Sequence, residues 1–235
     1  MARILLLETA TEVCSVALSV DGTIVASAEK TEGFRHSELV TLYVDQVIRE
    51  WDSGVELLDA VCVCRGPGSY TGLRIGVSVA KGMCYALDIP LLSVSTLNAM
   101  ASHMAFRTRG EELSGNAPPL LCPMIDARRM EVYTALFDNQ GNQLSEITAA
   151  IIGEDSFADS LATQKVWFFG NGASKCQAVI RHPNAIFPGE VLASARFMSS
   201  LAEERFNNNA FENVSYFEPF YLKDFVATVP KNKVF

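Results

Sequence analysis

Short apolar runs separated by polar turns open the chain. Residues 4–7 are continuously apolar, residues 14–20 alternate between apolar and polar, and residues 23–28 return after the Asp21-Gly22 pair. Period-two alternation is typical of strands, and Asp-Gly is a favoured two-residue hairpin turn. The pattern predicts a three-stranded meander whose first turn, 8–12, presents hydroxyl groups and a carboxylate.

A run with helical spacing follows at 37–51. Its apolar positions are wider than the single stripe of a surface helix, because residues flanking the inner stripe are apolar too. These flanking residues are Leu39, Leu42 and Tyr43. A surplus of apolar area indicates either a deeply buried helix or a helix that a partner protein covers.

A glycine-rich turn at 65–76 joins an apolar strand, 58–64, to a second helical run that ends near residue 87. Gly66 and Gly68 permit a positive φ and close backbone approach, and Pro67 fixes a φ between them. The spacing matches neither a P-loop nor a dinucleotide-binding fingerprint. Two interpretations stay open, a rigid structural turn and a helix start that binds anions.

Three glycines lie within this second helical run, at positions 72, 76 and 82. Glycine inside a helix costs about 1 kcal/mol relative to alanine, so their presence indicates close approach of another backbone. That backbone belongs either to the sheet beneath or to a helix of another chain. If it is another chain, the predicted contact residues on the two helices are Leu39, Leu42, Tyr43, Gly72, Gly76, Val79 and Met83.

The second half of the chain repeats the order of elements of the first half. Leu7-Glu8-Thr9-Ala10 aligns with Ile125-Asp126-Ala127-Arg128, and the turn at 65–69 matches the one at 169–173. Repeated element order is a sign of duplication. We therefore expect an α/β fold of two lobes with mixed sheets flanked by helices, divided into residues 1–106, a linker at 107–119 and a reduced lobe at 120–235.

Charge and composition narrow the function. The chain of 235 residues has 27 acidic and 19 basic residues, a formal net charge of -8, so it is a poor lone ligand for nucleic acid. No apolar run approaches the roughly 20 residues needed to span a membrane, and the beginning of the sequence lacks a signal-peptide layout. The six cysteines contain no C-x-x-C pair and are interpreted as reduced, which favours the cytoplasm.

Several runs resemble the TsaB (YeaZ) family of the actin-like ATPase superfamily, whose glycoprotease-like branch this sequence is similar to. They are ILLLETAT at 4–11, CSVAL at 14–18, RHSE at 35–38 and GPGSYTGLRIG at 66–76, and the tail EPFYL at 218–222 adds a weaker match. The resemblance implies two RNase H-like lobes. It also implies a role in making N6-threonylcarbamoyladenosine at position 37 of tRNA.

The same resemblance implies partners. A TsaD-like subunit transfers the threonylcarbamoyl group and holds a metal, a TsaE-like ATPase binds the pair, and tRNA is met only through the complex. The segment corresponding to the metal-binding pair, 93–101, contains no histidine, and His103 lies outside the expected positions. The expectation is a non-catalytic scaffold that binds TsaD through its first two helices and pairs with itself when alone. It requires no metal or cofactor of its own, although ATP or ADP could lie at the complex interface.

Two enzymatic alternatives stay open. An actin-like ATPase would use the cleft between the lobes, with Glu8, Thr9, Thr11 and Asp126 near the phosphates. Glu8 stands where the superfamily usually has aspartate, and the longer arm displaces the carboxylate, so a vestigial site is favoured. A peptidase would need a metal with a base, or Ser69 with a histidine and an aspartate, and the scattered His36, His103 and His182 form no such motif.

Overall fold

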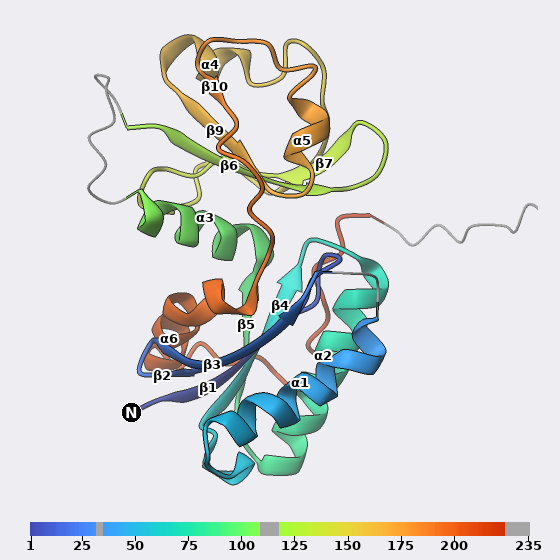
Figure 1. Cartoon of the computed structure of the whole chain (residues 1–235), viewed down its shortest axis with the longest axis vertical. Coiled ribbons are helices and arrows are strands. Elements are labelled where there is room, and N and C mark those ends of the chain that lie inside the picture. The colour runs from blue at the N-terminus through green and yellow to red at the C-terminus, as the bar shows by residue number, and fades with distance from the viewer. Residues whose placement is uncertain (32–34, 109–117, 224–235) are drawn as a thin grey trace, which may run out of the picture.

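The computed structural model describes residues 1–31, 35–108 and 118–223, which form two lobes (Figure 1). The first lobe contains a five-stranded sheet in the order β3-β2-β1-β4-β5. Its central strand, β1, pairs antiparallel with β2 and parallel with β4. The strands are β1 (Arg3–Glu8), β2 (Cys14–Val20), β3 (Thr23–Lys30), β4 (Ala60–Gly66) and β5 (Leu91–Ser95).

The second lobe repeats this topology in a sheet of order β10-β9-β6-β7-β8. Here β6 pairs antiparallel with β7 and parallel with β9, as β1 does with β2 and β4. The strands are β6 (Leu120–Asp126), β7 (Glu131–Thr134), β8 (Thr148–Ile151), β9 (Val166–Phe169) and β10 (Ala185–Ile186). The predicted α/β fold of two duplicated lobes is confirmed.

Apolar side chains cover both faces of the first sheet. On one face, α1 (His36–Glu50) and α2 (Tyr70–Leu87) pack through Val40, Val47 and Val77 against the inner residues of the strands. Ser69 caps α2 by accepting from Gly72 N–H at 3.3 Å. The 3-10 turn η1 (Val55–Leu57) follows α1 on this face, and the 3-10 turn η2 (Ala195–Met198) packs on the opposite face of the sheet.

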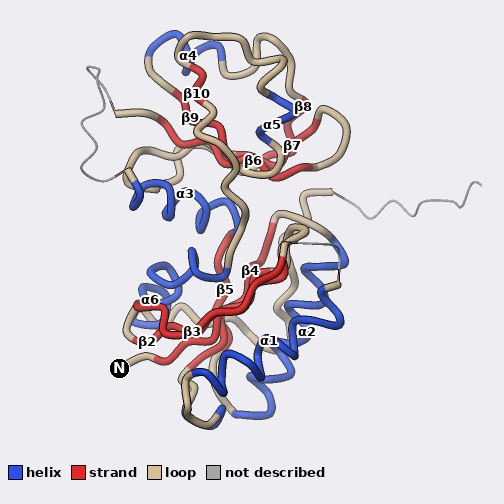
Figure 2. The backbone as a smooth tube through the Cα atoms, viewed as in Figure 1, coloured by secondary structure: helices blue, strands red, loops and turns tan. Residues whose placement is uncertain are grey.

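The helix α3 (Thr96–Arg107) lies between the two sheets, below the second lobe in the view of Figure 2. Its buried side chains pack against β6, β9 and the segment after β7. The other face of the second sheet is covered by α4 (Ala158–Thr163) and α5 (Ala173–Cys176). Much of the predicted linker, 109–117, lies outside the described residues.

One predicted boundary is wrong. The expected unit 120–235 does not stay in the second lobe, because η2 and α6 (Ser199–Asn207) return to the first sheet. Ser19 and Ser199 hydrogen-bond through their hydroxyls at 2.7 Å, and Glu212 N–H donates to the Leu91 carbonyl at 2.8 Å. The apolar face of the first sheet opposite α1 and α2 needs cover, and the returning chain supplies it.

The glycines of the 65–76 turn bring α2 against the first turn of the same chain. A Cβ at Gly68 would lie 2.2 Å from the Ala10 carbonyl oxygen, and one at Gly72 would lie 2.1 Å from that of Thr9. A Cβ at Gly76 would lie 2.3 Å from Thr9 Oγ1. Gly72 and Gly76 are therefore buried in their own lobe, which corrects their assignment to an intermolecular contact.

Substitution of a buried glycine and of an open glycine of α2 should have opposite effects on stability. Gly72→Ala places a methyl group against a backbone carbonyl and should lower the free energy of unfolding by about 3 kcal/mol. Gly82→Ala meets nothing within 4 Å and should raise it by up to about 1 kcal/mol. Urea unfolding of both variants tests the prediction, and equal effects would contradict it.

Candidate functional site

The first turn, where a nucleotide phosphate was predicted to bind, is closed. Glu8 and Thr9 are completely buried, and Thr11 is nearly so. Ala10 N–H donates to Glu8 Oε1 at 2.7 Å, and Ser69 N–H donates to the Ala10 carbonyl at 2.6 Å. Glu8, Thr9 and Thr11 are therefore not accessible to a phosphate in this conformation, because α2 covers the turn.

The environment of Glu8 is that of a buried structural group. Burial raises its pKa to about 7, and hydrogen bonds from Ala10, Cys64 and Thr9 offset only part of that rise. Thr9 N–H donates to Cys64 Sγ at 3.2 Å, and the pKa of that thiol lies well above its ordinary value because it is buried beside Glu8. The carboxyl is thus enclosed inside the lobe in this conformation.

Asp126, the fourth predicted phosphate residue, lies at the surface of the second lobe. It forms an ion pair with Lys175, and its own carboxylate accepts from Arg128 N–H at 2.9 Å. Glu12, rather than Glu8, connects the two turns, since Asn171 donates to Glu12 Oε2 at 2.6 Å and accepts from Asp126 N–H at 3.0 Å. The structure therefore separates Glu8 from Asp126 and bridges the lobes with an amide.

Apolar side chains fill the junction behind this bridge. Leu97, Met100 and Ala101 of α3 are buried with Ile125 and Phe169 of the second sheet. The three α3 residues belong to the segment 93–101, where the resemblance implies that a TsaD-like transferase has its metal-binding pair. Across the described part of the chain, no group of three or more His, Cys, Asp or Glu side chains could hold a metal ion.

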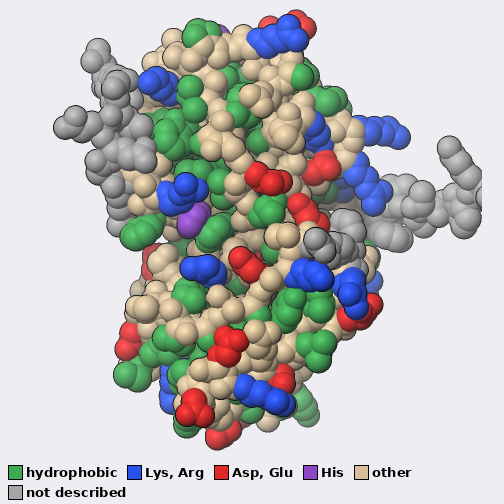
Figure 3. All heavy atoms as spheres, viewed as in Figure 1, with side chains coloured by type: hydrophobic (Ala, Val, Ile, Leu, Met, Phe, Trp, Pro, Cys, Tyr) green, Lys and Arg blue, Asp and Glu red, His purple; other side chains and the backbone are tan. Residues whose placement is uncertain are grey.

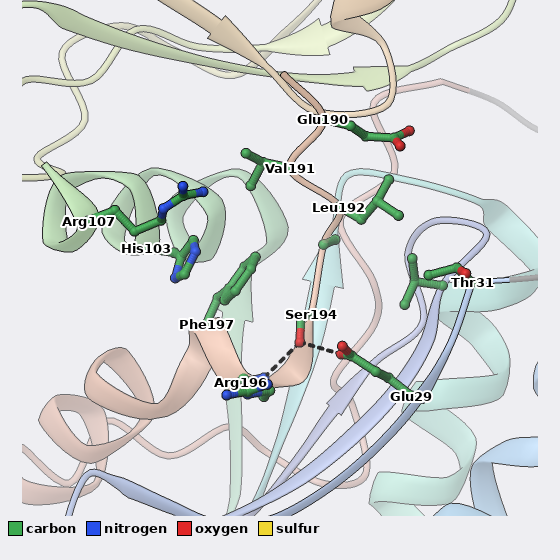
Figure 4. A pocket seen from close by; sticks show the side chains of 12 residues that line it. Glu29, Thr31, His103, Arg107, Glu190, Val191, Leu192, Ser194, Arg196 and Phe197 are labelled. Atoms are coloured by element: carbon green, nitrogen blue, oxygen red, sulfur yellow. Dashed lines mark hydrogen bonds between the residues drawn. The ribbon is translucent and has the colours of Figure 1, made fainter. Parts of the chain in front are cut away.

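A pocket does lie at one side of the junction, lined by α3, the end of β3 and the connection 190–197 (Figure 4). His103 stacks on Phe197 with ring centroids 3.7 Å apart, and burial together with Arg107 and Arg196 lowers its pKa to about 4. Ser194 Oγ donates to Glu29 at 2.7 Å across the floor. The lining carries both signs of charge and excludes Glu8, Thr9 and Asp126, so it is separate from the predicted phosphate site.

The outward surface of α1 and α2 carries unusual apolar exposure. Leu42 is 61% exposed and Tyr85 is 88% exposed. Leu39, Tyr43, Val79 and Met83 are half-buried and pack against the core of the first lobe. The predicted contact residues other than the two buried glycines are therefore at least partly exposed on α1 and α2.

Gly82 is the glycine that faces away from its own lobe. It is exposed in the middle of α2, and a Cβ there would meet nothing within 4 Å. No neighbour in the described chain requires glycine at this position. Packing inside the lobe therefore does not explain why the helix carries a glycine there, at a cost in stability relative to alanine. The residue spacing places Ser78 and Tyr85 on the same face, a signal that sequence reasoning passed over.

The fold defines a two-lobed α/β protein whose lobes share one sheet topology and whose junction is packed largely by apolar side chains. A family model described as TsaD: tRNA N6-adenosine threonylcarbamoyltransferase matches residues 30–231. The tRNA threonylcarbamoyladenosine biosynthesis protein TsaB of Escherichia coli is 32% identical over 231 residues, covering 96% of each chain. TsaB of Bacillus subtilis is 33% identical over 144 residues, 61% of this chain and 58% of that protein.

A solved structure agrees with the sequence relatives. YeaZ from Pseudomonas aeruginosa superposes with a TM-score of 0.79 at 27% identity, covering 94% of this chain and all of that one. The chain therefore belongs to the TsaB (YeaZ) family, the proteins of tRNA threonylcarbamoyladenosine biosynthesis. Among the described residues, no helix has the length and apolar character that crossing a bilayer requires.

The buried carboxyl should make stability depend on pH. The folded pKa of Glu8, about 7, exceeds the ordinary value of 4.5, so stability present below pH 4.5 is lost as pH rises to 7. Glu8→Gln removes this loss. Relative to wild type, the variant should gain about 3 kcal/mol in unfolding free energy between pH 4.5 and pH 8. Urea titrations at both pH values measure this, with exposed Glu50→Gln as control, and a pH-independent difference would contradict it.

Proposed function

We propose that this chain is a non-catalytic subunit of tRNA threonylcarbamoyladenosine synthesis, which binds and supports a TsaD-type transferase through α1 and α2. A TsaE-type ATPase would then bind the pair. The observation that carries the proposal is the exposed Gly82 of α2, with Tyr85 exposed one turn further along and Leu42 exposed on the neighbouring helix α1 (Figure 1). Contiguous exposed apolar surface marks a protein contact in soluble proteins.

Helix packing explains how this surface would work. Ser78 and Gly82 are small and exposed on α2, so a partner helix can approach the backbone closely there. Tyr85 would then supply a large side chain on the same face of α2, and Leu42 would supply another from the neighbouring helix α1. A transferase that shares the fold of this chain can present a similar helix pair, which favours a four-helix contact. Without the transferase, a second copy of this chain would cover the same surface.

The interior of the chain supports the non-catalytic part of the proposal. Catalysis by an actin-like ATPase needs an accessible carboxylate at the first turn, and Glu8 is completely buried. The position of the transferase's metal pair is occupied by packed apolar residues of α3, including Leu97 and Ala101. A subunit whose own cleft is closed contributes surface to its partner.

Bulk at Gly82 should block assembly without unfolding the chain. Gly82→Trp fits the free chain because nothing lies within 4 Å, but it occupies the space of a partner helix. We expect affinity for the transferase subunit to fall about ten-fold or more, which size-exclusion chromatography and calorimetry measure. Gly153→Trp is the matched control, since Gly153 is equally open but lies in the second lobe. Normal assembly of the Gly82 variant, with an unchanged Tm, would reject this surface.

Nucleotide binding separates this proposal from the ATPase alternative. The isolated chain should give no calorimetric signal with ATP or ADP and Mg²⁺ at millimolar concentration, because Glu8, Thr9 and Thr11 are enclosed. A signal that appears only after the transferase subunit is added would locate nucleotide at the shared interface. Turnover by the isolated chain that Glu8→Gln abolishes would favour the ATPase.

A further inference from the structure

Arginines and aromatic rings form a continuous strip that runs from α2 to the second lobe. Arg74 lies over the Tyr70 ring at 5.3 Å, and Tyr70 contacts Tyr221 of the tail with ring centroids 4.9 Å apart. Arg65 lies over Phe220 at 6.0 Å.

Lys223 of the tail contacts the second lobe, where it lies over the Tyr133 ring at 5.9 Å. Arg128 of the β6–β7 turn acts on the pKa of that same tyrosine. We call this set, completed by the adjacent Arg129, the basic–aromatic strip.

Among the residues that the structure describes, four guanidinium groups of the strip form no ion pair. Lys223 pairs with Glu131, but within the described ranges no carboxylate lies in ion-pair distance of the four exposed arginines. They are Arg65, Arg74, Arg128 and Arg129. The chain has eight more acidic than basic residues, so four exposed arginines without an ion pair among the described residues are notable. In Figure 3, Lys and Arg side chains gather on the right-hand edge above and below the waist of the molecule.

Two of the four arginines, on the β6–β7 turn, have an unfavourable backbone conformation. Arg128 has φ 73° and Arg129 has φ 51°, both in the left-handed region. Residues with a Cβ disfavour this region, and glycine or asparagine is usual there. Two consecutive arginines in it indicate a selection for their side chains rather than for the turn.

We propose that the basic–aromatic strip binds a single-stranded segment of the tRNA substrate. This inference rests on the proposed function and extends it, because it assigns to this chain a direct contact with tRNA, where sequence analysis expected contact only through the complex. Guanidinium groups bind phosphates, and the partly exposed rings of Tyr221 and Phe220 offer faces on which unpaired bases stack. The proposed function brings a polyanion with unpaired bases to this chain, and an acidic protein partner is the alternative that the assembly measurement below tests.

The number of arginines in the strip predicts how strongly tRNA binding should depend on salt concentration. The strip draws on the start of α2, the tail at 220–223 and the β6–β7 turn, so the bound strand crosses from one lobe to the other. Each phosphate contact on a single strand contributes about 0.7 to the slope of log affinity against log salt. Four arginines therefore account for a slope of roughly 3, and each contact for about five-fold in affinity near 0.1 M salt.

The decisive variant is Arg128→Asn combined with Arg129→Gly. Both new residues suit a positive φ, so Tm should rise by about 2–4 °C. In the complex reassembled with the transferase subunit, tRNA affinity should fall roughly twenty-fold and the salt slope should fall by about 1.4. A more stable chain that binds tRNA less well cannot be explained by unfolding.

The matched control removes two positive charges elsewhere. Lys165→Gln with Arg181→Gln neutralises side chains beside β9 and β10, at the opposite edge of the second sheet from β7. This control should leave tRNA affinity and its salt slope unchanged. Arg65→Gln with Arg74→Gln should reproduce the loss from the first lobe.

The outcomes separate the two proposals. Normal assembly of the Arg128/Arg129 variant with unaltered tRNA affinity overturns the strip and leaves the proposed function standing. Loss of assembly by the same variant overturns it too, because the strip would then meet a protein. Failure of the wild-type chain to bind the transferase overturns the proposed function. In that case, ultraviolet crosslinking of the isolated chain to tRNA at low salt tests whether the strip binds RNA. The proposal requires crosslinks at Tyr221 or Tyr70, and the Arg128/Arg129 variant must reduce them.

Discussion

The close contact between α2 and the first turn determines most of what this protein can do. Gly68, Gly72 and Gly76 remove the side chains that would hold the helix away, and the backbone of Thr9 and Ala10 occupies the space they leave. The Ser69 N–H to Ala10 carbonyl bond closes the contact. A turn that could have faced a phosphate is thereby converted into the floor of a packed core, and Glu8 becomes a buried structural carboxyl.

The duplicated fold extends this packing across the junction, apart from the pocket between α3 and residues 190–197. Two copies of the same sheet topology face each other across α3, and such an arrangement usually leaves a ligand cleft between domains. Here apolar side chains of α3 meet Phe169 and Ile125, while Asn171 joins Glu12 to the backbone of Asp126. Once the interior is occupied, the functional surface must lie outside, on the helices and edges of the lobes.

That outer surface has two regions with different chemistry. The apolar region on α1 and α2, centred on Gly82, suits a protein partner, since hydrophobic area and small residues favour helix packing. The basic–aromatic strip suits a polyanion with stacking bases. Each region contains residues that are unfavourable for the local backbone conformation. They are a glycine inside a helix in one case and arginines with positive φ in the other. Departures of this kind are expected at functional positions.

Periodicity and turn chemistry predicted the first four strands and the two helices on the first sheet, the repeated order of elements indicated the duplication, and short specific runs such as GPGSYTGLRIG carried the resemblance to the family. They could not tell which chain approaches a helical glycine. Gly72, Gly76 and Gly82 look alike in sequence, yet two face Thr9 and one faces outward, since helix rotation is set by packing. The return of α6 to the first lobe and the enclosure of Glu8 likewise depend on contacts between residues far apart in the chain. Only tertiary packing decides those, because burial is a property of the assembled layers.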